Sequence, residues 1–268
     1  MNSNSTLSVA IMSGKGGVGK TNIALNLACA LYAMEYRALL MDCDLGLANL
    51  DVMLGVAPEG TLQDLLLSDA DASSVLYSLA DGFDILPAAS GVPELVEMDN
   101  DMCDLLLRRM LPVLSHYDYV FLDLGAGINR TVQSFASMAA ARIVVVTPEP
   151  TALTDSYALI KVLATHHKVR DFLVVINQVE NRKEEKATFK RLFAACQRFL
   201  GVEPALLGSI RTDRRVPEAV RRQTPYVNAF PESPASQDII EIARKLIRIR
   251  DAMEDALSRR NVLQALPS

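Results

Sequence analysis

A glycine-rich segment near the start of the chain carries the strongest chemical signal in the sequence. Residues 14–21 match the phosphate-loop pattern G-x-x-x-x-G-K-[ST] at every position. Glycines there let successive main-chain N–H groups point at an anion that side chains would block. Lys20 is expected to reach the β- and γ-phosphates, and the Thr21 hydroxyl to ligate Mg²⁺. We therefore predict a site for ATP or ADP with Mg²⁺, formed by Gly14, Lys15, Gly16, Gly17, Val18, Gly19, Lys20, Thr21 and the following Asn22.

Two acidic segments could complete a metal and hydrolysis site. Asp42 and Asp44 stand two residues apart at a predicted strand end, so their carboxylates lie on one side of an extended chain. Such a pair is repulsive unless a cation and phosphate-bound water lie beside it. A second predicted strand ends at Asp123, in an Asp-x-Gly-x-Gly sequence whose Gly125 N–H could sense a terminal phosphate. For the first segment, a solvated acidic turn that caps a helix is the alternative.

The elements that must position these residues can be predicted from the apolar pattern. Continuous apolar runs such as residues 143–146 are expected for parallel strands covered on both faces. Strands are predicted at 7–13, 37–42, 83–87, 119–123, 143–147, 172–177 and 206–210. Helices are predicted at 20–34, 101–115, 130–140, 152–166, 184–199, 217–223 and 238–257. This alternation predicts an α/β fold, a doubly wound, mainly parallel sheet with helices on both faces.

Ligands of doubly wound sheets bind beyond the carboxyl ends of the strands. If the strand predictions hold, the segments just past those ends gather on one rim. They are Gly14–Thr21, Asp42–Asp44, Asp123–Gly127, Pro148–Pro150, Asn177 and Arg211–Asp213. Most of the polar and glycine-rich residues that interrupt the apolar pattern fall in these segments, so the rim is the predicted site.

Length and composition limit the class of protein. The 268 residues fit one domain, predicted at 1–258, with a C-terminal tail at 259–268. Net charge is −5, so the surface as a whole offers no footprint for nucleic acid. The four cysteines are far apart and never form C-x-x-C, as expected for reduced thiols in a cytoplasmic protein. No signal peptide and no membrane-spanning run is evident, so any membrane contact is expected to be peripheral.

The phosphate loop also carries a family resemblance. Its sequence G-K-G-G-V-G-K-T resembles the deviant Walker A motif of the MinD/ParA class of ATPases, and the likeness spans residues 9–246. The resemblance implies that Lys15 reaches across a homodimer interface to the partner's nucleotide, as an arginine finger does. It also implies that Asp44 positions the attacking water and that Asp42 and Asp123 support the Mg²⁺ shell. Lys15, Lys20 and Asp44 are then the catalytic set.

The same resemblance assigns further nucleotide contacts. Asn49 is implied as an outer contact of the acidic site. Asn177 matches the asparagine that reads the adenine edge, although an asparagine that only caps a strand end is an equal alternative. Arg211 and Asp213 lie where the class forms the other adenine wall, and there we expect main-chain contacts more than side-chain contacts. Relatives usually carry a small hydroxyl residue where this chain has Leu124.

Within the class, three segments resemble the FlhG family of flagellar-number regulators, also called FleN or YlxH: residues 44–51, 147–161 and 219–225. This resemblance implies an ATP-dependent switch that regulates flagellar number or placement through a flagellar GTPase or a transcription activator. It also implies peripheral membrane contact through the tail at 259–268. For the apolar stripe at 239–257 that leads into this tail, a helix packed on the sheet is the alternative. Here only Met1–Thr6 precede the first strand, so the segment with which many relatives stimulate the GTPase is not matched.

Other functional classes fit the sequence less well. A MinD- or ParA-type positioning or partitioning ATPase is the closest alternative, and a cluster of arginines at 211, 214, 215, 221 and 222 bears on DNA binding. A carboxylate-activating ligase would need further catalytic machinery, and no amidotransferase Cys/His arrangement is evident. An iron–sulfur carrier of the same superfamily is disfavoured because C-x-x-C is missing.

Overall fold

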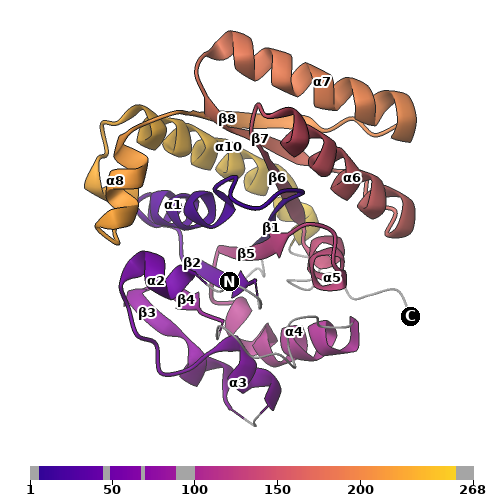
Figure 1. The fold of residues 1–268 in the computed structure, drawn as a ribbon. Coiled ribbons are helices and arrows are strands. Elements are labelled where there is room, and N and C mark those ends of the chain that lie inside the picture. The colour runs from indigo at the N-terminus through magenta and orange to yellow at the C-terminus, as the bar shows by residue number, and fades with distance from the viewer. Residues whose placement is uncertain (1–5, 45–48, 68–69, 89–99, 258–268) are drawn as a thin grey trace.

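One sheet of eight strands organises the computed structural model, in the order β3-β4-β2-β5-β1-β6-β7-β8 (Figure 1). All paired strands run parallel except β3, which is antiparallel to β4. The structure describes residues 6–44, 49–67, 70–88 and 100–257. The strands are β1 Leu7–Ser13, β2 Ala38–Cys43, β3 Tyr77–Ala80, β4 Phe83–Leu86, β5 Tyr119–Ala126, β6 Ala141–Val146, β7 Leu173–Val179 and β8 Ala205–Arg211.

Helices cover both faces of the sheet. On one face lie α3 Leu62–Leu67, α4 Asn100–Leu114, α5 Arg130–Met138, α6 Pro150–His166 and α7 Arg182–Leu200, with the 3₁₀ turn η1 Ala72–Val75. The other face is covered by α1 Lys20–Tyr32, α2 Leu50–Leu54, α8 Arg215–Arg221, α9 Tyr226–Ala229 and α10 Pro234–Leu257. Among the described helices, none combines the length and apolar character that crossing a membrane requires.

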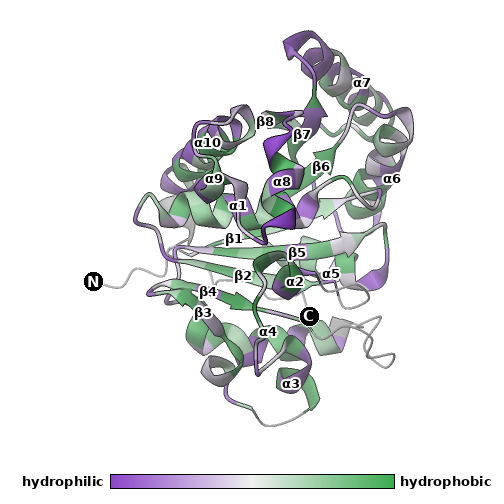
Figure 2. Ribbon diagram, turned by 60° about the vertical axis from the view of Figure 1, so that its left-hand side comes forward, coloured by the Kyte–Doolittle hydropathy of each residue, from purple (hydrophilic) through white to green (hydrophobic). Residues whose placement is uncertain are grey.

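Side chains of the central strands alternate between two apolar cores. In β5, Val120 and Leu122 face the core under α4–α7, while Phe121 faces the core under α1 and α10. Figure 2 shows the central strands in the green of apolar residues, as expected for strands covered on both faces. The two cores hold the strands in one register, and this register fixes where the strand ends fall.

The doubly wound α/β prediction is confirmed, and every strand and helix predicted from the sequence has a counterpart. Several strand ends were wrong. The pairing of β5 continues past Asp123 to Ala126, because Cys43 of β2 and Ser13 of β1 still align with it. Likewise β7 passes Asn177 and β8 includes Arg211. The division into a domain at 1–258 and a tail stays a prediction, since residues 258–268 lie outside the described ranges.

The sequence missed β3, η1, α2, α3 and α9. Strand β3 is an edge strand with no fully buried residue, so it lacks the apolar run by which the others are found. The missed helical elements have four to six residues each, too short to show a helical period. Tertiary packing rather than local propensity therefore defines these short elements.

Close packing of α10 on the edge strand β8 gives a first prediction. A Cβ added to Gly208 would lie 2.6 Å from Cγ1 of Ile242, which is itself buried. We expect Gly208→Ala to lower the free energy of unfolding by about 1–3 kcal/mol through overpacking. Ile242→Ala should cost about 2–5 kcal/mol alone. In urea unfolding, the double variant should lose less free energy of unfolding than the sum of the losses of the two single variants. Strict additivity would contradict the contact.

Candidate functional site

The loop between β1 and α1 is shaped by three glycines. Gly17 and Gly19 have φ of 76° and 92°, the left-handed region that other residues rarely adopt. A Cβ on Gly14 would lie 2.1 Å from the main-chain carbon of Asp155, so α6 approaches the loop too closely for any side chain. The Ser13 hydroxyl donates to the Lys15 carbonyl at 2.7 Å and braces the turn. The loop is thus preformed as an anion-binding concavity at the start of a 13-residue helix.

The two lysines of this loop occupy different environments. Lys20 is buried, with 8% of its surface exposed, at the first position of α1. Lys15 keeps 39% of its side chain exposed. Its Nζ lies 2.5 Å from Oε2 of Glu149 and 3.2 Å from the hydroxyl of Thr151, both at the N-terminus of α6. Lys20 is therefore placed to serve its own loop, whereas Lys15 lies at the surface of the rim.

Asp42 and Asp123 are brought side by side by the register of the sheet. They are aligned partners on the parallel strands β2 and β5, and each is 2% exposed. Burial raises the pKa of Asp42 to about 6, against hydrogen bonds that lower it. Burial and the charge of Asp42 raise the pKa of Asp123 to about 7, despite the Thr21 hydroxyl and Lys20. Two adjacent buried carboxylates cannot both ionise cheaply without a cation.

Asp42 also holds the chain that follows β2. One carboxylate oxygen accepts the N–H of Asp44 at 3.0 Å. The other accepts the N–H groups of Asn49 at 3.2 Å and Leu50 at 3.4 Å, at the start of α2. Asp42 thus caps the start of α2, as in the alternative interpretation of this segment, but it is buried and not solvated as that alternative requires. Asn49 reaches the acidic pair through its main chain, and residues 45–48 lie outside the described ranges.

One oxygen of the acidic pair fits a metal site. Oδ1 of Asp123 is buried without a hydrogen-bond partner among the described residues, although the Thr21 hydroxyl bonds to the same carboxylate. A buried carboxylate oxygen without a partner is costly unless a ligand satisfies it. Within the described ranges, no group of three or more His, Cys, Asp or Glu side chains could hold a metal alone. Two carboxylates and a hydroxyl suit Mg²⁺, which keeps waters and binds through nucleotide phosphates.

Asp44 and Gly125 meet across the strand ends. A Cβ on Gly125 would lie 3.4 Å from the Asp44 carboxyl carbon, so the glycine lets that carboxylate approach β5. The adjacent Leu124 is 1% exposed and belongs to the core under α4–α7. Its side chain is thus directed away from the rim. Asp42, Asp44, Asp123 and Gly125 form one acidic cluster beside the glycine loop.

A cavity of about 350 Å³ adjoins the loop on its other side. It is lined by Gly19, Asn22, Ile23, Asn177, Gln178, Ile210, Arg211, Thr212, Asp213, Arg214, Val216, Pro217 and Tyr226. The Asn177 amide donates to the Val18 carbonyl at 2.8 Å, and its oxygen accepts the N–H of Gln178 at 2.9 Å. Asn177 therefore braces the loop, as in the second interpretation of its position, and it also lines the cavity; its reading of an adenine edge stays a prediction.

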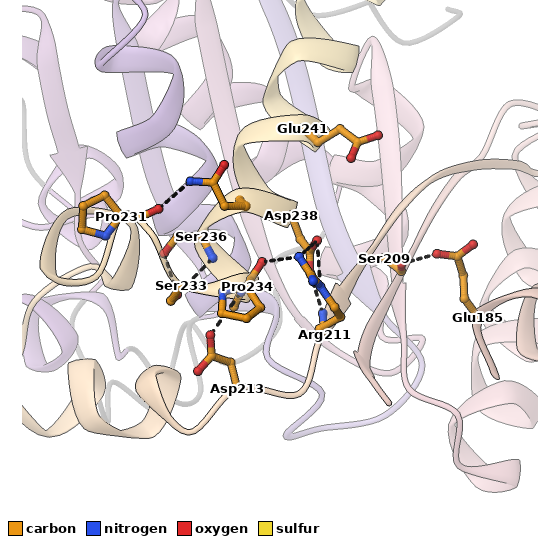
Figure 3. Close-up of polar contacts among 12 residues, drawn as sticks. Glu185, Ser209, Arg211, Asp213, Pro231, Ser233, Pro234, Ser236, Asp238 and Glu241 are labelled. Atoms are coloured by element: carbon orange, nitrogen blue, oxygen red, sulfur yellow. Dashed lines mark hydrogen bonds and ion pairs between the residues drawn. The ribbon is translucent and has the colours of Figure 1, made fainter. Parts of the chain in front are cut away.

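Arg211 at the end of β8 and Asp213 just after it are engaged in holding α10 (Figure 3). The Arg211 guanidinium forms an ion pair with Asp238 at 2.8 Å and donates to the Pro234 carbonyl. Asp213 accepts the N–H groups of Arg215 and Ala235. Their side chains are thus occupied within the protein, and main-chain contacts remain the expectation for this wall.

The structure brings together all the sequence-predicted site residues that it describes. The sequence missed the parts played by Ser13, Glu149, Asn26 and Tyr226. Glu149 lay within the predicted rim segment Pro148–Pro150, but nothing in the sequence paired it with Lys15. Tyr226 lines the cavity from the short helix α9, and Asn26 is buried within α1. Only the packing of distant segments reveals these contacts.

Comparison with known proteins agrees with this geometry. The family model described as the CobQ/CobB/MinD/ParA nucleotide binding domain matches residues 9–226. The antiactivator FleN of Pseudomonas aeruginosa is 38% identical over 89% of this chain and 85% of its own length. The flagellum site-determining protein YlxH of Helicobacter pylori is 36% identical over 92% and 83%. The septum site-determining protein MinD of Pyrococcus horikoshii, complexed with Mg-ADP, superposes with a TM-score of 0.77 at 27% identity and covers 93% of this chain and 98% of its own.

The buried acidic pair predicts how pH affects the nucleotide-free protein. Because the folded state raises the pKa of Asp123 from 3.8 to about 7, folded protein holds this proton more tightly than unfolded protein does. Its contribution to stability is present below pH 4 and is lost as the pH rises towards 7. Asp123→Asn removes this loss. The variant's advantage in free energy of unfolding should grow by on the order of 1–4 kcal/mol between pH 4 and pH 8.

With Mg-ADP, wild type should instead have the higher free energy of unfolding, because a ligand stabilises most the protein that binds it most tightly. Urea unfolding at several pH values, with and without Mg-ADP, measures both effects. A wild-type curve parallel to that of Asp123→Asn would mean that Asp123 is already ionised in the folded state.

Proposed function

This chain belongs to the CobQ/CobB/MinD/ParA family of nucleotide-binding domains, and from that premise we propose that it is a Mg²⁺-dependent ATPase that works as a dimerisation switch. ATP closes two copies into a homodimer, hydrolysis to ADP and phosphate reopens it, and partner proteins respond to the dimer. The observation that carries this proposal is the unequal placement of Lys15 and Lys20 in one phosphate loop, one at the surface and one buried.

Residues of the phosphate loop and the acidic cluster supply the chemistry of a single subunit. Loop N–H groups and Lys20 bind the β- and γ-phosphates, where Lys20 offsets negative charge in a site that excludes water. Thr21, Asp123 and Asp42 would hold Mg²⁺, which when bound would neutralise negative charge on the phosphates. Asp44 lies beside Gly125 and orients the attacking water. Lys15 is not needed for any of these steps within its own subunit.

Lys15 supplies what a second copy adds. In the single chain it is held by Glu149 and Thr151. Both partners of this ion pair are more than a third exposed, so the pair is worth at most about 1 kcal/mol. A triphosphate on a facing subunit offers more charge than Glu149 does, so release of Lys15 costs little. Hydrolysis is then slow in the monomer, because the catalytic set is complete only in the dimer.

The biological output we propose is control of flagellar number or placement. This rests on similarity to FleN, an antiactivator, and to YlxH, a flagellum site-determining protein. A transcription activator or a flagellar GTPase is the proposed partner of the dimer. Counting flagella in a deletion strain complemented with wild type or with Lys15→Ala tests it. Equal restoration by both proteins would separate the flagellar role from the switch.

A DNA-partitioning role is less well supported by the arginine cluster. Arg215 and Arg222 both pair with Glu218 and lie over the ring of Phe230. Arg211 pairs with Asp238. Two carboxylates, Glu218 and Asp238, thus oppose the charge of three of the five arginines, which reduces the positive charge available for phosphate contacts.

Subunit complementation tests whether Lys15 acts across the dimer. Lys15→Ala and Asp44→Ala should each lose at least about 100-fold in turnover, given the magnitudes known for charge-stabilising residues. A mixed dimer contains one composite site with both residues intact. An equal mixture should therefore recover about a quarter of the wild-type turnover, because half of the dimers are mixed and each has one working site. Lys186→Ala, on exposed α7, is the control. No recovery on mixing would place Lys15 in its own subunit's site.

Asp44→Ala should also trap the ATP-bound dimer, because nucleotide binds but the attacking water is not oriented. A sizing column run with Mg-ATP should show a doubled mass for this variant and a mixture for wild type. The same variant with Mg-ADP should elute as a monomer, and so should Lys20→Ala with either nucleotide. A monomeric Asp44→Ala protein that retains ATP would contradict the switch.

A further inference from the structure

A buried asparagine lies behind the cavity next to the phosphate loop. Asn26 is fully buried in the middle of α1, among apolar residues. Its oxygen accepts the N–H of Val227 in α9 at 2.9 Å. Its Nδ2 donates to both the carbonyl and the side-chain oxygen of Asn22, at 2.7 and 2.8 Å. All the hydrogen bonds of this buried amide therefore run to α9 or to the cavity residue Asn22.

The direction of each hydrogen bond in this relay is fixed by main-chain groups. The Val227 N–H can only donate, so the atom of Asn26 that faces it must be the oxygen. The Asn22 carbonyl can only accept, so the atom that faces it must be Nδ2 of Asn26. That Nδ2 then needs an acceptor in the Asn22 side chain, which must turn Oδ1 inward. The NH₂ group of Asn22 is consequently the one that remains for the cavity.

The cavity side of Asn22 has no protein partner to use this NH₂ group. Asn22 is partly exposed and lines the cavity of about 350 Å³ with Tyr226. Among the described residues, its Nδ2 has no hydrogen-bond partner, so a ligand in the cavity would be offered a donor and no acceptor at this point. Because Val227 follows Tyr226, the same asparagine also anchors the cavity wall, which Ser236 holds from the other side.

We propose that Asn26 is a positioning residue that sets the hydrogen-bonding polarity of the nucleoside pocket. It orients Asn22 to donate to an acceptor on the nucleoside part of the bound nucleotide, a purine ring nitrogen or a ribose oxygen. Asn26 itself touches no ligand. The proposal rests on the ATP-binding function proposed above and adds a specificity element to it, since a donor fixed in advance rejects ligands that lack the matching acceptor.

Nucleotide analogues that lack one acceptor each provide the test. Binding of the Mg²⁺ complexes of ATP, 1-deaza-ATP, 3-deaza-ATP, 7-deaza-ATP and 2′-deoxy-ATP is measured by calorimetry. Wild type should bind one of the four analogues about 5–10-fold more weakly than ATP, the worth of one hydrogen bond. Asn22→Ala and Asn26→Leu should each reduce that ratio to less than about 2-fold, and the double variant should reduce it no further.

The ratio separates positioning from simple loss of stability. A variant that only lowers the folded fraction weakens all nucleotides equally and leaves their ratio unchanged. Leu27→Ala, a buried neighbour in α1 outside the relay, provides this control and should keep the wild-type ratio. An Asn26→Leu protein with the full wild-type ratio, or a wild type that ranks all analogues equally, would overturn the proposal. A wild type that binds no adenine nucleotide would instead overturn the proposed function.

Discussion

The repulsion between two buried carboxylates on neighbouring strands is the interaction on which the rest of the site depends. Asp42 and Asp123 are aligned in the β2–β5 register and buried, and each raises the other's cost of ionisation. Such a pair destabilises the folded protein as the pH rises through neutrality, and either a proton or a bound cation relieves the repulsion. The site is therefore destabilised in the absence of ligand, as functional sites often are. Burial of apolar side chains in the two cores must offset this destabilisation.

One of these carboxylates also connects the proposed metal site to the main chain that follows β2. Asp42 binds the main chain on both sides of residues 45–48 and so links the acidic pair to the start of α2. A change in the charge of Asp42 therefore changes the strength of its hydrogen bonds to Asp44, Asn49 and Leu50. The ion pair of Lys15 and Glu149 lies on the same rim and is weak enough to exchange partners. The contacts of these rim residues are therefore set by charge and not by apolar packing.

The cavity proposed to hold the nucleoside is organised differently. There the polar groups are neutral amides held in fixed orientations: Asn177 braces the loop at Val18, and Asn26 orients Asn22. Neutral amides give direction without a large cost of burial when each atom has a partner. The proposed phosphate site is thus dominated by charged groups and the adjoining cavity by neutral hydrogen-bonding groups, and α1 carries residues of both.

The sequence alone determined the glycine loop, the parallel sheet and the rim on which the polar segments meet, because these depend on local rules: glycine spacing, apolar runs and strand-end geometry. It could not determine the short helices, the true end of β5, or any pairing between residues distant in the chain. That Asp42 faces Asp123, that Lys15 rests on Glu149 and that Asn26 reaches Val227 are consequences of strand register and helix packing. Strand register and helix packing depend on both cores as a whole, so they cannot be predicted from any local segment of the sequence.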